Sequence, residues 1–379
     1  MLVDRILYDL DTPAPEDSGG NPIRGSRLGR CARQSAYMLY PSAYPPEPLP
    51  ARSKLVFAFG DMVHELVRRH FRRVVPGQWG MEEARFWLPV PLSTKAAEAA
   101  RLKIETGELP GYHLIRTAPP VPGERVSLVL DLAGPVLYVS LHVDGIADCG
   151  PVYGLAAAEI KSMTTAGFRR ALAGHVDYSY RVQMAAAVEA TALDTELYVA
   201  VRKDTCHLLE VLYSRRVDKV RVTFTKQSTL VAVREVEIDD WEAALVEHPF
   251  EPDLIEEARA RVGRILLATP TRLPEREHAP DFTCRTCDGT GQQVNAKNTR
   301  LPLKRGPKPC EDCHQRGRLE EAELTWQCRY CPWVWHCWKD AKPRLDFDKD
   351  AKPHIYVTRD AVLTAGIPLP VATTIPEGR

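Results

Sequence analysis

Several absences narrow what this chain of 379 residues can be. No apolar run approaches the roughly 18–20 residues that a membrane-spanning helix needs. The opening residues, MLVDRILYDLD, are acidic early and lack a small-residue cleavage site, so they do not resemble a signal peptide. Basic and acidic residues balance at 50 each, so no overall field draws the protein to nucleic acid or membrane. These absences predict a cytoplasmic protein without membrane contact.

The chain also lacks a nucleotide-binding P-loop, because no GxxxxGK[ST] segment occurs in it. Any unwinding of nucleic acid must therefore come from a partner. Cysteine, in contrast, is plentiful, and most of the ten cysteines stand in CxxC-like clusters. In a reducing cytosol this spacing points to metal rather than to disulfides. Cys149 and Cys206 stand outside the clusters and are expected to be small buried thiols.

Hydrophobic periodicity across residues 57–270 predicts an α/β domain. We expect helices at 29–40, 54–75, 180–193 and 240–268, and strands at 137–150, 154–163, 195–203 and 206–214. Residues 76–124, which contain the proline clusters LPVPL and APPVPG, are predicted to be irregular. The strand GLAAAEIKSM is short and largely apolar, which predicts a central position in a sheet.

Two charged residues break the apolar pattern of that strand. Glu159 and Lys161 are two positions apart, so they project from one face. Asp144 ends the polar face of the preceding strand, and with Glu159 it forms a candidate site for a hard divalent cation. His64, one turn after Gly60 on the helix at 54–75, is a candidate imidazole ligand. The alternatives are a surface ion pair at a strand end and a partly buried, hydrogen-bonded histidine.

Taken in order, this pattern resembles the PD-(D/E)XK nucleases of the RecB-like exonuclease branch. The resemblance spans about residues 60–190 and rests on Gly60-x3-His64, Asp144, Glu159-x-Lys161 and Gln183. It implies a restriction-endonuclease-like α/β core, in which helices flank a central mixed sheet, with a C-terminal cysteine-rich metal region. It also implies the site residues: His64, Asp144, Glu159 and the Ile160 carbonyl for Mg²⁺ or Mn²⁺, catalytic Lys161, and Gln183 against DNA.

Two departures from the family pattern bear on the site. The tyrosine expected four residues after the glutamine is Ala187 here, so Tyr180, one turn upstream, is the candidate replacement as a substrate contact. The glycine usually found three residues before the metal-binding aspartate is Leu141, which leaves Asp148 as a rival of Asp144. We favour Asp144 because it continues the polar face of the strand.

The segment WQCRYCPWVWHCWKD, residues 326–340, has one thiol too few for a closed four-coordinate site. Its cysteines follow the pattern C-x2-C-x5-C. His336 is adjacent to Cys337, so ligation of one ion by both would be strained. A single N-terminal cysteine together with such a triplet resembles the iron–sulfur RecB-like exonucleases, including the CRISPR-associated Cas-four-type family and phage relatives.

This second resemblance implies a [4Fe–4S] cluster held by Cys31, Cys328, Cys331 and Cys337. Such a cluster would clamp the two ends of the chain together, so Cys31 and Cys337 are expected to be neighbours. The tryptophans of the segment are expected to pack around the cluster; they are Trp333, Trp335 and Trp338.

A second pair of cysteine motifs precedes this segment and predicts a zinc site. Cys284 and Cys287 open CRTCDGTG, which resembles the CxxCxGxG unit of DnaJ-type zinc fingers, and Cys310 and Cys313 form a looser copy. The basic residues between the pairs are candidates for phosphate contact. A purely structural zinc site is the alternative.

Together these features predict an N-terminal segment with one cluster ligand (1–56), a nuclease core (57–270), a zinc-knuckle insertion (281–320), a cluster segment (321–340) and a C-terminal tail (341–379). The predicted function is a metal-dependent DNA nuclease, an exonuclease acting on single strands or duplex ends. A helicase, or a recombination or CRISPR adaptation protein, is the expected partner. The alternatives are a catalytically impaired nucleic-acid-binding scaffold of the same fold, and a zinc-only interaction module.

Overall fold

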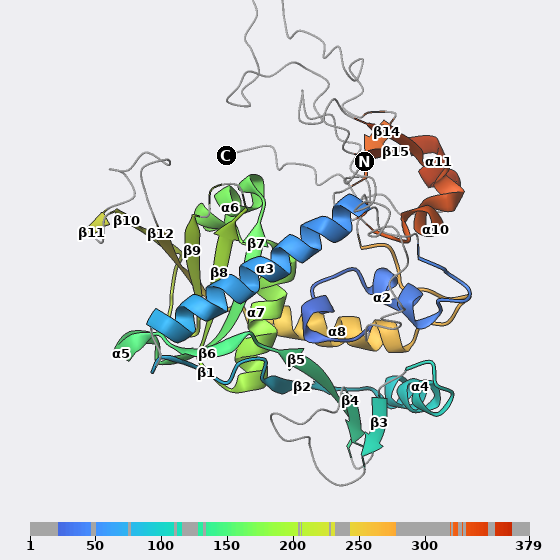
Figure 1. The fold of residues 1–379 in the computed structure, drawn as a ribbon. Coiled ribbons are helices and arrows are strands. Elements are labelled where there is room, and N and C mark those ends of the chain that lie inside the picture. The colour runs from blue at the N-terminus through green and yellow to red at the C-terminus, as the bar shows by residue number, and fades with distance from the viewer. Residues whose placement is uncertain are drawn as a thin grey trace, which may run out of the picture. The chain divides into compact units, whose positions relative to one another are not determined.

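The computed structural model divides into two compact units (Figure 1). Unit 1 comprises Met1–Tyr40 and Leu49–Pro274, and unit 2 comprises Pro41–Pro48 and Glu275–Arg379. The structure describes residues 22–46, 51–74, 77–109, 112–115, 128–131, 134–203, 205, 207–226, 229–231, 243–277, 319, 321–324, 328, 331–347 and 353–365. Within these ranges no helix is both long enough and apolar enough to span a membrane.

An eight-stranded sheet forms the centre of unit 1. In spatial order its strands are β1 (Trp79–Gly80), β6 (Gly145–Asp148), β7 (Leu155–Met163), β8 (Thr195–Arg202), β9 (Leu208–Ser214), β12 (Ala243–Pro249), β10 (Arg221–Lys226) and β11 (Thr229–Val231). β7 pairs with β8 in parallel, as β12 does with β9, and the other pairs are antiparallel. The expected α/β fold with a central mixed sheet is confirmed.

The predicted strand at 137–150 is two strands that belong to different sheets. β5 (Val136–His142) lies in a four-stranded sheet with β2 (Arg85–Pro91), β4 (Leu128–Asp131) and β3 (Tyr112–Ile115), whereas β6 lies in the central sheet. The apolar face was predicted correctly, since its four side chains are at most 2% exposed: Leu137, Val139, Leu141 and Val143. The alternation continues through the break, which is why the sequence does not reveal it.

Residues 76–124 are not irregular throughout, as we expected. They contain β1, β2, β3 and the helix α4 (Thr94–Glu105), which starts at Ser93, whose side chain accepts a hydrogen bond from the Ala96 amide. β2 carries Pro89 and Pro91, and within the described residues it is an edge strand whose one partner is β5. Proline is tolerated there because an edge strand needs no donor on its open side.

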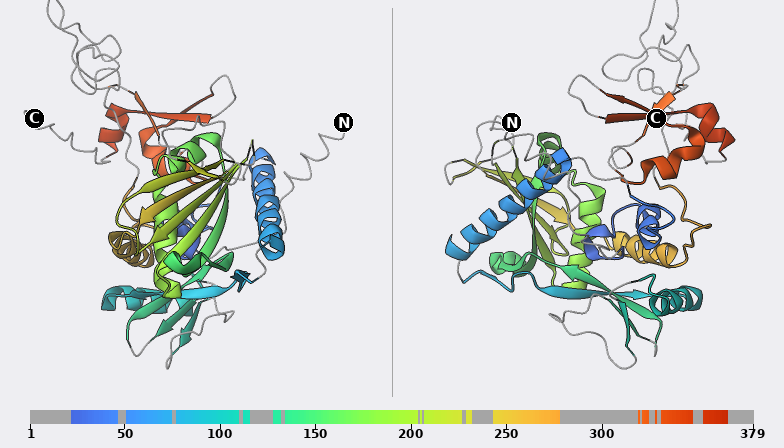
Figure 2. Two further views of the ribbon diagram at one scale, coloured as in Figure 1. Left: turned by 90° about the vertical axis from the view of Figure 1, so that its left-hand side faces the viewer. Right: turned by 45° about the vertical axis from the view of Figure 1, so that its right-hand side comes forward.

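Helices cover both faces of the central sheet. α3 (Ala51–Val74) crosses one face, and α7 (Tyr178–Thr191) packs on the other (Figures 1 and 2). Besides α4, the other described helices of unit 1 are η1 (Gly25–Arg27), α2 (Ala32–Leu39), α5 (Gly150–Tyr153), α6 (Thr165–Leu172) and α8 (Asp253–Leu266). The helix expected at 240–268 is therefore wrong in its first part, where β12 ends at Pro249 and α8 begins only after Pro252.

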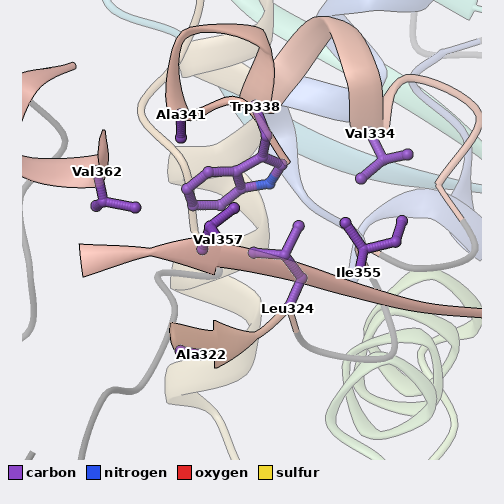
Figure 3. Close-up of a cluster of buried hydrophobic side chains, with 8 residues drawn as sticks. All are labelled: Ala322, Leu324, Val334, Trp338, Ala341, Ile355, Val357 and Val362. Atoms are coloured by element: carbon purple, nitrogen blue, oxygen red, sulfur yellow. The ribbon is translucent and has the colours of Figure 1, made fainter. Parts of the chain in front are cut away.

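Unit 2 contains a three-stranded antiparallel sheet in the order β13 (Glu321–Glu323), β15 (Pro353–Thr358), β14 (Arg344–Phe347). Its described helices are α10 (Val334–Trp338), the 3-10 turn η3 (Lys339–Ala341) and α11 (Arg359–Thr364). We expected residues 341–379 to be a tail, but up to Ala365 their described part forms secondary structure. Ile355, Val357 and Val362 join Trp338 of the cluster segment in one core (Figure 3).

Candidate functional site

The candidate site lies where β7 extends beyond its neighbour β6. The β6–β7 ladder begins with Gly145 opposite Ala158, so β6 pairs with none of the later residues of β7. Asp144, the residue just before β6, donates its amide to the Ala158 carbonyl at 2.9 Å. Its Oδ2 accepts a hydrogen bond from the Ile160 amide at 2.7 Å. The side chain of Asp144 thereby continues the ladder and is held beside Glu159.

Helix α3 brings His64 to the same place. Val67 and Phe71 pack against the apolar cluster of Ala156, Ala158 and Ile160, which fixes the buried side of the helix. One turn before His64, an added Cβ at Gly60 would lie 3.3 Å from Oγ of Ser162, so the helix backbone passes close to β7 there. The Nδ1 of His64 lies 3.6 Å from Oδ2 of Asp144.

Glu159 and Lys161 project from the other face of β7, under α7. Lys161 Nζ donates to Oε1 of Glu159, and the Gln183 amide on α7 is near enough to Glu159 to lower its pKa. Glu159 and Gln183 are each 7% exposed, so the interaction is largely shielded from water. The structure therefore brings His64, Asp144, Glu159, Lys161 and Gln183 together, from three separate parts of the sequence.

Burial and mutual contacts shift the pKa values of these groups in different directions. Burial opposes ionisation of Asp144, but the contacts from His64 and the Ile160 amide, with the charges of His64 and Lys161, outweigh it and lower its pKa. Burial raises the pKa of Glu159, and the Asp144 charge adds to this, while Lys161 and Gln183 offset it only in part. Burial would lower the pKa of Lys161, but the charge and hydrogen bond of Glu159 raise it. Lys161 is therefore a cation at neutral pH.

The two rival aspartates have different surroundings. Asp148 lies opposite Leu155 at the far end of the β6–β7 ladder, is exposed, and accepts a hydrogen bond from the Gly150 amide at 2.9 Å. Asp144 instead lies beside Glu159. The geometry favours Asp144, as the alternation of the strand did.

The residues of α7 that we expected to contact substrate are buried or half-buried. Ala187 is buried at 2% exposure, so no side chain replaces the family tyrosine at that point. The ring of Tyr180 lies 5.5 Å from that of Tyr198 on β8 and is half-buried. Tyr180 thus packs on the sheet next to the site, and its contact with substrate stays a prediction.

Sequence reasoning missed a second acid on the same face of the sheet. Glu196 on β8 is 1% exposed, and burial together with the charge of Glu159 raises its pKa well above the usual range. The available signal was the alternation in TELYVAV, which places Glu196 and Tyr198 on one face of the strand that follows the predicted helix of Gln183.

Within the ranges that the structure describes, no three histidine, cysteine or carboxylate side chains converge as a metal-ligand set. In unit 1 the candidate ligands instead bond one another: Lys161 pairs with Glu159, and His64 with Asp144. The donor types nevertheless fit a hard divalent cation, which takes carboxylate oxygens. Two acids in a shielded site also leave negative charge that such a cation would offset.

The cysteines of the predicted cluster are divided between the units. Cys31, at the start of α2, belongs to unit 1, whereas Cys328, Cys331 and Cys337 belong to unit 2. All four are half-buried. The expected proximity of Cys31 and Cys337 stays a prediction. The zinc-knuckle cysteines lie outside the described residues, as does Cys206; they are Cys284, Cys287, Cys310 and Cys313.

The three described cysteines of unit 2 pack against its core. Each packs against the cluster centred on Trp338, whose indole lies between α10 and β15 (Figure 3). Trp338 is 1% exposed, and its Nε1 is buried without a hydrogen-bond partner in the described part of the chain. A buried donor without a partner, in a core against which three thiols pack, suits a sulfur-rich group that accepts hydrogen bonds. Trp333 is also buried, and Trp335 is half-buried.

Two contacts in unit 2 were not foreseen from sequence. Arg276 donates from Nε and Nη2 to the Cys337 carbonyl, at 2.9 and 2.6 Å, and its guanidinium lies 5.3 Å from the Trp338 ring centroid. Trp333 Nε1 donates to the Tyr44 carbonyl at 2.9 Å. The chain segment that follows α2 therefore packs against the helix that carries Cys337. No local motif marks either contact.

Comparisons with known proteins add little to this geometry. No family model matches the chain, and no curated protein matches it. Among solved structures, the crystal structure of SSO0001 is similar at 12% identity and a TM-score of 0.32, covering 57% of this chain and 80% of that chain. A likeness at this level carries no argument about function.

Proposed function

We propose that this protein is a Mg²⁺- or Mn²⁺-dependent deoxyribonuclease that hydrolyses phosphodiester bonds, as an exonuclease. One observation supports the proposal above the others: Asp144, Glu159 and Lys161 meet at one end of the β6–β7 ladder, with His64 from α3 and Gln183 from α7. A simple surface ion pair at a strand end would not need residues from two helices beside it. The arrangement is suited to a reaction that develops negative charge.

Asp144, Glu159, His64 and the Ile160 carbonyl are the residues that would hold the cation. When bound there, Mg²⁺ or Mn²⁺ would polarise a phosphoryl oxygen and acidify a water molecule. Because the pKa of Lys161 is raised, its ammonium group is suited to orient the attacking water and stabilise charge on the phosphate rather than to act as a base. Gln183 holds Glu159 in place and is our candidate DNA contact.

The metal sites of unit 2 belong to the same proposal. Cys328, Cys331 and Cys337, with Cys31 as the fourth ligand, would hold a [4Fe–4S] cluster that joins the two ends of the chain. Cys284, Cys287, Cys310 and Cys313 would hold Zn²⁺. A helicase, or a recombination or CRISPR adaptation protein, would supply duplex opening.

The test is cleavage of single-stranded and duplex DNA by anaerobically purified protein with Mg²⁺ or Mn²⁺. We expect Glu159→Ala and Lys161→Ala to lose activity by a factor on the order of 10²–10³, because the first removes a ligand of the cation and the second removes the positive charge beside the reacting phosphate. Asp144→Asn should do the same. Asp148→Asn is the matched control, since its carboxylate lies at the other end of the ladder, and it should retain wild-type activity.

Unchanged cleavage in Glu159→Ala and Lys161→Ala would disprove the site. An inactive wild type that still binds DNA would instead favour a catalytically impaired scaffold of this fold. One observation favours that second function: Ala187 is buried where the family has a tyrosine that contacts substrate.

A further inference from the structure

Glu196 occupies an unusual position in the central sheet. In the β7–β8 register Glu196 lies opposite Ala157, and Tyr198 lies opposite Glu159. Residues opposite each other in a sheet share a face, so Glu196 and Tyr198 project from the side of β7 that carries Glu159 and Lys161. Glu196 therefore stands diagonally next to Glu159, and it is 1% exposed.

One oxygen of its carboxyl group, Oε2, lacks a hydrogen-bond partner among the described residues. Oε2 of Glu196 and the hydroxyl of Tyr198 are buried, and neither has a hydrogen-bond partner among the residues that the structure describes. A buried polar atom without a partner costs about 1–3 kcal/mol. The nearby ammonium of Lys161 is bonded to Glu159. Tyr213, opposite Glu196 on β9, has its hydroxyl engaged as the acceptor from the Glu251 amide at 2.8 Å.

An apolar side chain would fold better at this position, so the acid at 196 has no structural reason that these contacts reveal. Charge balance gives a different reason. Asp144 and Glu159 carry two negative charges when ionised, and Lys161 offsets one of them. A third carboxylate next to Glu159 restores a net charge of two, which a divalent cation would neutralise.

We propose that Glu196 is a third carboxylate of the divalent-cation site, acting through Oε2 on the buried side of Glu159, with the Tyr198 hydroxyl beside it. This inference rests on the proposed function, because it assigns a further residue to the same cation site. In this arrangement Glu159 on β7 and Glu196 on β8 both hold the cation, together with Asp144 and His64.

The experiment measures Mn²⁺ binding to the full chain by electron paramagnetic resonance and calorimetry. Thermal melting of the same protein without Mn²⁺, called metal-free below, is measured alongside. We expect Glu196→Gln to weaken Mn²⁺ binding about 10- to 100-fold. The same variant should keep or raise the melting temperature without metal, because it removes a buried acid that has no partner. Tyr198→Phe should weaken binding by less, in the same direction.

Glu210→Gln is the matched control. Glu210 is opposite Val199 on the neighbouring strand, so it projects from the face that α3 covers, and its replacement should leave Mn²⁺ affinity unchanged. Glu196→Leu is a second variant with no charge and similar volume. It should lower Mn²⁺ affinity as Glu196→Gln does and raise the metal-free melting temperature.

The outcomes separate this inference from the proposed function. If the wild type binds no Mn²⁺, the cation site itself fails. If Glu159→Gln weakens binding while Glu196→Gln and Glu196→Leu bind as the wild type does, only the role of Glu196 is overturned. A loss of metal-free stability in both Glu196 variants would also overturn it, because it would show that the acid serves the fold.

Discussion

The candidate sites of the two units are built in different ways. In unit 1, Glu159 and Lys161 stand on a nine-residue strand inside an eight-stranded sheet, and the register of β6, β7 and β8 sets their neighbours. In unit 2, the cysteines lie on or before a five-residue helix, next to a sheet of three short strands. The first site lies in an extended sheet, whereas the described part of the second lies beside a few short elements.

The cores of the two units show the same contrast. Among the residues that the structure describes, the buried cluster of unit 2 has eight side chains: Ala322, Leu324, Val334, Trp338, Ala341, Ile355, Val357 and Val362. Small cores seldom stabilise a chain without a metal, a disulfide or a partner. We therefore expect metal at the cysteines to stabilise unit 2, while the sheet of unit 1 folds without metal. The predictions that follow test this difference.

The largest expected effect is on the metal content of unit 2. Cys337→Ser replaces one thiolate of a four-thiolate cluster, so we expect the purified protein to lose its iron and its visible absorbance. Unit 2 should then become sensitive to protease, while the far-ultraviolet circular dichroism of the central sheet persists. Iron analysis, absorbance and limited proteolysis of anaerobic protein measure these changes.

Cys149→Ser is the control for that experiment. Cys149 is a half-buried thiol of unit 1 that packs against the apolar cluster around Ile160. Its replacement should leave iron content at the wild-type level. Full iron in Cys337→Ser would remove that residue from the cluster and contradict the contrast between the units.

A glycine pair tests how strictly the sheet fixes the site of unit 1. At Gly145, next to Asp144, an added Cβ would lie 2.4 Å from the Trp79 ring, so Gly145→Ala requires the strand or the ring to move. We expect the free energy of unfolding to fall by about 1–3 kcal/mol, measured by urea denaturation, with iron content unchanged.

Gly60→Ala should behave differently. Its added Cβ would meet only the Ser162 hydroxyl oxygen, at 3.3 Å, and alanine favours the helix by about 1 kcal/mol over glycine. This variant should therefore be neutral or slightly more stable. Equal losses at both glycines would show that the strand around Asp144 is no more constrained than the helix.

The smallest effect concerns thiol reactivity. Burial raises the pKa of the Cys149 thiol to about 11, and the charges of Glu210 and Asp148 add to the shift. Because the thiolate is the reactive form, alkylation of Cys149 in the folded protein should be slow at pH 8 and rise about tenfold per pH unit up to pH 11. Mass spectrometry of iodoacetamide-treated protein measures the rate.

The denatured chain is the reference for this measurement, since an unperturbed cysteine has a pKa of about 8.5. The cysteines of unit 2, after removal of iron, should react much faster at pH 8 than Cys149 does. Alkylation of folded Cys149 at the denatured rate would show that its surroundings in unit 1 are open to water.

Much of the core and of the candidate site was predictable from local pattern. Alternation along GLAAAEIKSM placed Glu159 and Lys161 on one face, and the continued alternation through Val143 favoured Asp144 over Asp148, as the geometry does. The sequence led to a wrong prediction for β2, because the position of a strand at the edge of a sheet outweighs the low strand propensity of proline. β2 was missed because Pro89 and Pro91 argue against a strand unless it is known to lie at an edge.

Residue types and their spacing determined that this chain is an α/β protein with a central apolar strand and two candidate metal regions. Only the tertiary structure decided which side chains meet. The break between β5 and β6 leaves Asp144 to cap the Ile160 amide, and the β7–β8 register brings Glu196 next to Glu159. The physical reason is that periodicity fixes the face on which a residue lies, whereas strand pairing, which depends on residues far apart in sequence, fixes its neighbour.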